Sequence, residues 1–171
     1  MTLVPDQAYD YLALARRRLF DQVRLLAGDE YTREFPFGHR SLRRTLTHIM
    51  VSEWYYVQRI CGNDVPPYET WPLREENPPV FSDLEAAWTR LAAQTREALK
   101  GVGEWDQGLE YVVTDDAQCR KIVSTTAGEL FMQLLCHEVH HRAQAMAMLS
   151  QLGRPTGDLD FNALMFKRRD A

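Results

Sequence analysis

Apolar residues recur at every third or fourth position in four long segments of the sequence. This spacing places the apolar side chains along one side of an α-helix and the polar ones along the other. The segments are residues 6–27, 41–61, 82–100 and 126–152. Each begins near a residue that can cap a helix N-terminus, namely Asp6, Ser41, Ser82 or Asp83, and Thr126 with Glu129 three residues later. The pattern therefore predicts four amphipathic helices.

Glycine and proline mark the connections between these helices. Residues 28–38 are expected to form a loop, and residues 63–80 contain five prolines, which neither a helix nor a central strand accommodates. A link this long lets the two helices that it joins run parallel, because the chain travels the length of the bundle between them. Two β-prone stretches, residues 110–113 and 121–123, flank a turn at residues 114–116 and predict a small hairpin.

The predicted fold class is all-α, a four-helix bundle with a long crossover between its second and third helices. A chain of 171 residues can bury a core without disulfides, so we expect residues 1–171 to form a single domain. The tail after residue 152 is expected to fold back onto the bundle through Phe161, Leu164 and Phe166. The run of Arg16, Arg17 and Arg18 is expected on the solvent-exposed side of the first helix.

The charge, hydropathy and cysteine content of the sequence limit which partners, cellular location and cysteine chemistry we expect. The formal charge of -4 predicts no basic surface for nucleic acid. No run of about 18 apolar residues predicts a membrane span, and the N-terminus lacks the order of a signal peptide, so we expect a cytoplasmic protein. The three cysteines, Cys61, Cys119 and Cys136, are scattered and odd in number, which indicates neither a disulfide framework nor a cysteine zinc site.

Candidate chemistry lies in histidines on two of the predicted helices. His137 and His141 are four residues apart on one helical face, a spacing at which two imidazoles can bind one transition metal. The same pair can also be core histidines with hydrogen-bond partners. His48 would add a third nitrogen and leave a coordination position open, as in catalytic sites, with zinc, nickel, iron or cobalt as fitting metals. The nearest candidates for orienting ligands or handling protons are Glu53, Gln133, Glu138 and His140.

The segment His137–His141 also matches H-E-x-x-H, the helical motif of zinc peptidases in which the glutamate is the general base. The metzincin extension of this motif would require Gly and His where this chain has Gln144 and Ala147. Asp160 is a candidate third ligand, but no strand-rich segment is available to hold a peptide. A metal-dependent hydrolase with Glu138 as its base is therefore an alternative.

Three parts of the sequence together resemble the DinB superfamily, which includes the YfiT-like proteins described as hydrolases. They are T-L-T-H-I-M-V-S-E-W around His48, the proline-rich crossover, and H-E-V-H-H-R-A-Q-A-M-A-M-L-S-Q-L-G. The resemblance covers almost the whole chain. Its most specific part is H-x-x-x-H-R-x-Q, here His137, His141, Arg142 and Gln144. This chain has Cys136 and Ala143 where members often have Asn and Gly.

The resemblance implies an up-down-down-up bundle, commonly a homodimer, with a divalent metal in a cleft. The three metal-binding histidines of the family fall on His48, His137 and His141, and we expect zinc or nickel. Characterised relatives include metal-dependent transferases and isomerases that use low-molecular-weight thiols such as mycothiol or bacillithiol. A metal-dependent S-transferase acting on a small-molecule substrate is therefore the first hypothesis. A non-catalytic, stress-related metal-binding dimer is the second, and the hydrolase using Glu138 is the third.

Overall fold

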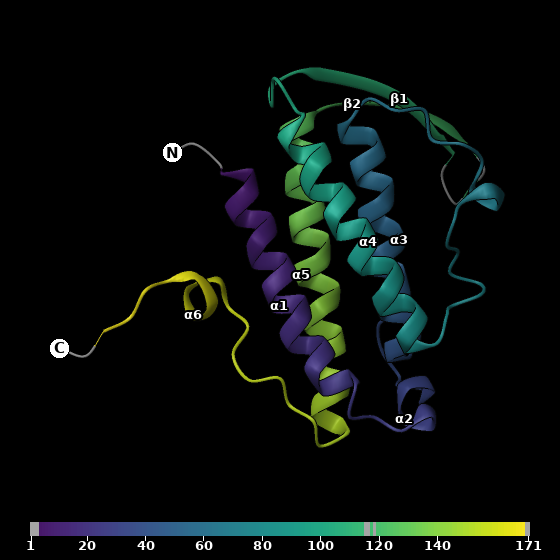
Figure 1. Ribbon diagram of the computed structural model, residues 1–171. Coiled ribbons are helices and arrows are strands. Elements are labelled where there is room, and N and C mark those ends of the chain that lie inside the picture. Colours follow the sequence, from purple (N-terminus) through teal and green to yellow (C-terminus); the bar gives the residue numbers. More distant parts are fainter. Residues whose placement is uncertain (1–3, 115–116, 118, 170–171) are drawn as a thin grey trace.

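The computed structural model describes residues 4–114, 117 and 119–169. Its main elements are four long helices that lie side by side (Figure 1): α1 (Pro5–Val23), α3 (Leu42–Ile60), α4 (Phe81–Lys100) and α5 (Ala127–Gln151). Shorter elements are α2 (Gly28–Thr32), the 3-10 helix η1 (Tyr68–Thr70), the strands β1 (Gly108–Thr114) and β2 (Arg120–Thr126), and α6 (Phe161–Met165). The chain is mostly helical, as the sequence predicts, but the two strands mean that it is not all-α.

Predicted caps fix the start of two long helices. The Ser41 side chain accepts a hydrogen bond of 3.3 Å from the N–H of Arg44 at the start of α3. At the start of α5, Thr126 accepts from the N–H of Glu129, while the Glu129 carboxylate accepts from the N–H of Thr126. These bonds satisfy N–H groups that the first helical turn leaves without partners. The predicted starts of the second and fourth helices are therefore confirmed.

The predicted end of the first helix is wrong. α1 ends at Val23, and the short helix α2 occupies part of the stretch that was expected to be a loop. Tyr31 of α2 is buried, and its ring packs edge to face on Phe81 at 5.7 Å between centroids. This contact spans 50 positions in the sequence, from 31 to 81, so the local pattern could not reveal it.

The predicted cap of the third helix is wrong as well. α4 begins at Phe81 after Val80, so Ser82 and Asp83 lie within its first turn instead of preceding it. The ring of Phe81 also packs on Phe20 of α1, with centroids 5.1 Å apart. Phe81 thus packs on both α1 and α2 at the point where α4 begins.

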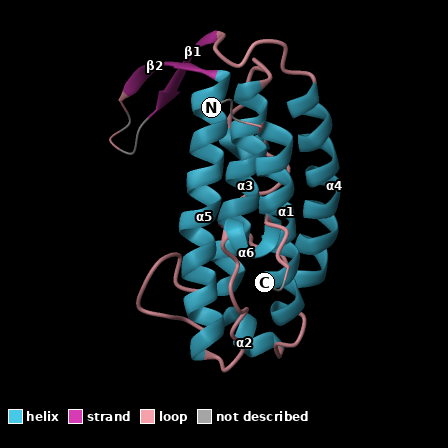
Figure 2. Cartoon of the chain, turned by 90° about the vertical axis from the view of Figure 1, so that its left-hand side faces the viewer, coloured by secondary structure: helices cyan, strands magenta, loops and turns pink. Residues whose placement is uncertain are grey.

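The predicted hairpin is confirmed, with longer strands than expected. β1 and β2 pair antiparallel, from Gly108 opposite Thr126 to Thr114 opposite Arg120. Residues 115 and 116 of the predicted turn lie outside the described residues. The hairpin extends from one end of the bundle (Figure 2), and its last residue, Thr126, is also the cap of α5. The sheet is thereby joined to the helix that carries most of the histidines.

One hydrophobic core runs through the bundle, and its most buried members include Leu12, Leu46, Leu84 and Phe131, all at most 1% exposed. The C-terminal tail packs against this core. The hydroxyl of Tyr11 donates to the carbonyl of Leu159 at 3.1 Å, and the rings of Tyr11 and Phe161 lie 5.1 Å apart. Within the described parts of the chain, no helix is both long and apolar enough to cross a lipid bilayer.

Charged side chains also enter the core. Arg16 is only 6% exposed, so the expectation that it faces solvent with Arg17 and Arg18 is wrong. Arg16 lies four residues after Leu12 and three before Leu19, which places it on the apolar stripe of α1. Its charge is compensated inside the protein, because it forms ion pairs with Glu53 and Glu138, both buried as well.

Candidate metal centre

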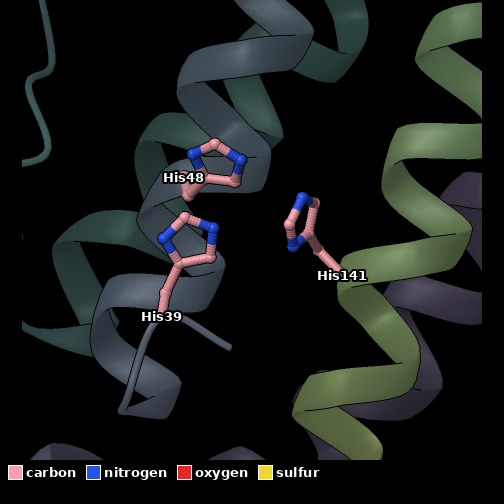
Figure 3. A group of neighbouring side chains, drawn as sticks. All are labelled: His39, His48 and His141. Atoms are coloured by element: carbon pink, nitrogen blue, oxygen red, sulfur yellow. The ribbon is translucent and has the colours of Figure 1, made fainter. Parts of the chain in front are cut away.

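Four of the five histidines gather between α3 and α5. His48 extends from α3, His137 and His141 extend from α5, and His39 comes from the loop before α3. Figure 3 shows His39, His48 and His141 pointing toward one another, and one ring nitrogen from each lies within 4.8 Å of the others. His137 adjoins this group, because its Nε2 lies 2.9 Å from Nε2 of His48 and its ring centroid 4.4 Å from that of His141.

The three histidines selected from the sequence therefore lie together, and the structure adds His39. No helical face or motif spacing marks His39, because it lies in a loop. The residues beside it, Gly38 and Arg40, have positive φ angles of 55° and 68°. A positive φ is uncommon for a residue other than glycine, and such residues often lie at functional sites. The one signal available in the sequence was a Gly-His-Arg turn placed directly before the helix that bears His48.

Burial favours the uncharged form of three of these imidazoles, those of His39, His137 and His141. It is the largest cause that lowers the pKa of His137 to about 3 and the pKa of His39 to about 4, with the neighbouring histidines as further causes. Burial likewise lowers the pKa of His141. A neutral imidazole retains the lone pair that a metal ion requires, whereas a protonated one does not. His39, His137 and His141 therefore have lone pairs available for a metal ion at neutral pH.

The crossover loop supplies a carboxylate that orients His48. Oε1 of Glu75 lies 2.7 Å from Nδ1 of His48, and this hydrogen bond is the largest cause that lowers the pKa of Glu75. When Nδ1 donates to Glu75, the lone pair of His48 is left on Nε2, which faces the other histidines. The loop itself is fixed in place: the N–H of Glu75 donates to the hydroxyl of Tyr68 at 3.0 Å, and Trp71 stacks on Tyr55.

Gln144 orients His141 in a similar way. Its Oε1 lies 3.0 Å from Nδ1 of His141, and its Nε2 lies 3.1 Å from Nε2 of His140. The loop that carries His39 comes close to the same amide. A Cβ atom on Gly38 would lie 2.6 Å from Oε1 of Gln144, so this position favours glycine both for its φ angle and for space.

Replacing Glu75 by alanine is expected to weaken zinc binding by about 10- to 100-fold, because His48 loses the partner that fixes its ring and its tautomer. Isothermal titration of the metal-free protein measures this change. Glu76→Ala is the matched control, since the Glu76 carboxylate accepts from Tyr68 at 3.1 Å and forms no hydrogen bond or ion pair with a histidine among the described residues. Equal losses in the two variants would contradict a specific role of Glu75.

Two acidic candidates from the sequence lie in the core. Glu138 is 3% exposed and accepts a hydrogen bond of 2.6 Å from Arg16, and Glu53 is 2% exposed and accepts one of 2.7 Å from the same guanidinium. Within residues 4–169, apart from the three undescribed positions, no hydrogen bond joins either carboxylate to a histidine. The structure thus places both of them in an ion-pair network instead of at the imidazole nitrogens.

The remaining candidates lie near the rim of the cluster. His140 is exposed, as expected for a residue beside the pair on the helix, and contacts Gln144. Gln133 donates to the hydroxyl of Tyr56 at 3.2 Å, and the Tyr56 ring packs edge to face on His137 at 5.7 Å. These two polar side chains therefore support neighbours of the histidines.

The donor set fits a divalent transition metal. Three histidines close together can hold a metal ion, and neutral imidazole is a good ligand for zinc, nickel, iron or copper. The geometry suggests one set of three metal ligands and the sequence motif suggests another. Both sets contain His48 and His141. The third ligand is His39 in the set whose three nitrogens lie within 4.8 Å of one another, and His137 in the set expected from the sequence.

Known proteins resemble this chain along most of its length. The sequence profile of the DinB family matches residues 1–170. Over 163 residues the chain is 21% identical to Protein DinB of Bacillus subtilis (strain 168), which covers 92% of this chain and 91% of that protein. The crystal structure of a DinB-like protein from Bacillus cereus ATCC 10987 is similar, with a TM-score of 0.58 at 16% identity, over 85% of this chain and 91% of that one. The structural likeness is one of fold.

Proposed function

Because this chain belongs to the DinB family, we propose that it is a divalent-metal-dependent enzyme that activates a low-molecular-weight thiol or a water molecule, of the S-transferase type. His48, His137 and His141 would hold zinc or nickel. The observation that carries the proposal is the gathering of imidazoles from separate segments of the chain, two of them oriented by Glu75 and Gln144. An arrangement with open coordination positions is typical of catalytic metal sites.

A bound metal would lower the pKa of a thiol or of water, so that the anion is available near neutral pH. The side chains around it position the reaction. Glu75 keeps the lone pair of His48 on Nε2, and Gln144 holds the ring of His141. The ring of Tyr56 packs edge to face on His137. In the transfer, the thiol proton would pass to water, and sulfur would form a bond to an electrophilic carbon as the leaving group departs with its electron pair.

We also propose how the helices run, how the chain assembles and where the protein acts. The proline-rich link at residues 61–80 supports an up-down-down-up bundle with α3 and α4 parallel. A homodimer is supported by the apolar side chains of Met132 and Val139, which are exposed on α5. We expect the protein to act in the cytoplasm on a small molecule, without nucleic acid or membrane as a partner.

The test is consumption of a thiol. Zinc- or nickel-loaded protein is expected to couple bacillithiol or mycothiol to monochlorobimane at least about tenfold faster than the same protein freed of metal, because the metal increases the fraction of thiolate. The fluorescence of the bimane product measures the rate, with chloride as the leaving group.

Two other results would replace this proposal. A protein that binds metal but accelerates none of several thiols would favour the non-catalytic metal-binding dimer. Metal-dependent hydrolysis that disappears in Glu138→Gln, in a variant that still folds and binds metal, would favour the hydrolase. The ion pairs of Glu138 with Arg16 in the core argue against this last result.

A further inference from the structure

A cavity separate from the histidine cluster lies between α3, α4 and the crossover loop, and none of the clustered histidines lines it. Its volume is about 440 Å³, within the range of about 300 to 1,000 Å³ that is usual for small-molecule sites. The walls are mainly apolar and are formed by Met50, Val51, Trp54, Leu73 and Leu91. Apolar walls of this kind exclude water and bind the hydrocarbon part of a ligand.

The polar part of the cavity wall is positively charged. Arg90 and Gln94, one turn apart on α4, line the cavity, and no acidic residue does. Arg90 is exposed, and it forms no hydrogen bond or ion pair with any residue that the structure describes. Arg24 and Arg96, which line a different cavity between α1 and α4, each pair with a carboxylate. The cavity at Arg90 therefore has a cation available for a ligand.

The walls are held in position from outside the cavity. The ring of Trp54 packs on Trp71 of the crossover loop, with centroids 4.9 Å apart, and Leu91 is only 6% exposed. Leu73 belongs to the same loop, two residues before Glu75. A cavity whose walls are already packed needs little ordering when a ligand binds, which favours affinity.

We propose that this cavity binds a small amphiphilic molecule with an apolar body and one carboxylate. The body lies along Trp54 and Leu91, and the carboxylate pairs with the guanidinium of Arg90. The amide of Gln94 can donate a second hydrogen bond to the same group. A neutral ligand of the same length gains only the apolar contacts, and a cationic one is repelled by Arg90.

Three ligands of equal chain length test the proposal. Octanoate, octan-1-ol and octyltrimethylammonium are titrated into the full-length protein by calorimetry, below the concentrations at which they form micelles. Octanoate is expected to bind one site about fivefold more tightly than octanol, as for a partly exposed ion pair, and the cation most weakly. In Arg90→Gln, octanoate and octanol are expected to bind equally well. Because Arg90 is exposed, this variant should retain its fold.

Two further variants complete the test. Arg18→Gln removes an exposed arginine from α1 that lines none of the walls of this cavity, and it should bind octanoate as the parent does. Ala87→Phe adds volume at the wall and should weaken all three ligands together. Failure of octanoate to bind, or a preference for octanoate that persists in Arg90→Gln, would overturn the proposal.

Discussion

Replacement of His48 or His137 by alanine is expected to lower the zinc affinity of the protein by more than about 100-fold, because loss of a ligand should exceed the 10- to 100-fold cost of misorienting one. The two residues are 89 positions apart in sequence, on α3 and α5, yet their Nε2 atoms lie 2.9 Å from each other. Loss of binding in both variants would therefore show that two helices that are distant in the sequence contribute ligands to a single site. Calorimetry measures the affinity, and elemental mass spectrometry of protein without a histidine tag measures the metal content.

The chain offers a matched control on the same helix. His140 is exposed and its ring lies 4.8 Å from that of His141, so His140→Ala removes a neighbouring imidazole that is not a proposed ligand. Since His140 reaches the cluster through a hydrogen bond to Gln144, this variant is expected to lower the zinc affinity by less than about tenfold, far less than loss of a ligand. Zinc affinity that is unchanged in both His48→Ala and His137→Ala would contradict the proposed site.

The same measurement on His39→Ala distinguishes the two possible ligand sets. We expect a smaller loss than for His137→Ala, because α5 holds His137 and His141 rigidly one turn apart, while His39 depends on a loop. A larger loss in His39→Ala would instead assign the metal to His39, His48 and His141. The two ligand sets thus predict opposite orders of zinc affinity for the His39→Ala and His137→Ala variants.

The parts of the fold that local sequence determines could be predicted. Helical periodicity identified the four long helices, and the hydrogen-bonding side chains of Ser41 and Thr126 identified where two of them start. Both signals act over one or two helical turns. The boundaries at Val23 and Phe81 were not predicted; near them, Phe81 packs on Phe20 and Tyr31, contacts between distant segments that a local pattern does not contain.

The candidate site likewise contains residues that the sequence could reveal and residues that it could not. Histidines on helices could be found because spacing places His137 and His141 on one face, and because His48 occupies a helix that packs against α5. His39 and Glu75 could not be found, since both lie in loops where no periodicity relates sequence to direction. Their contacts with His48 arise only when the loops fold against α3.

The buried position of Arg16 was missed for a different reason. The periodicity of α1 includes Arg16 among Leu12, Leu19 and Val23, so the position of this residue was available in the pattern. Its charge suggested solvent, because arginine is rarely buried without partners. The partners come from other helices, Glu53 of α3 and Glu138 of α5, and no local signal reveals them.

These partners form a compact network. Arg16 donates to Glu53 at 2.7 Å and to Glu138 at 2.6 Å, and Glu53 also accepts from Trp88 at 2.7 Å and from Thr95 at 2.8 Å. Burial acts to lower the pKa of Arg16, but the two carboxylates outweigh it and raise the pKa. The guanidinium therefore remains charged, and it connects α1 to both α3 and α5.

Replacing Arg16 by methionine is consequently expected to lower the free energy of unfolding by about 3 to 5 kcal/mol, because two carboxylates would remain buried without the cation between them. For a protein of this size, that corresponds to a decrease in Tm of about 6 to 20 °C. Thermal and urea unfolding followed by circular dichroism measure both quantities. Arg18→Met, two residues away and exposed, is the control and should change stability by less than about 0.5 kcal/mol.

A combined variant separates lost charge pairing from lost packing. Adding Glu53→Gln and Glu138→Gln to Arg16→Met removes Arg16 together with both of its carboxylate partners, so neither carboxylate remains in the core without that cation. Arg142, which lies 3.8 Å from Glu138, keeps its hydrogen bond to the hydroxyl of Tyr11. Since neutral or apolar replacements of a buried ion pair cost less than removal of one partner, the triple variant should be more stable than Arg16→Met alone. If Arg16→Met were as stable as Arg18→Met, or if the triple variant were the less stable of the two, the network would not stabilise the bundle through its charges.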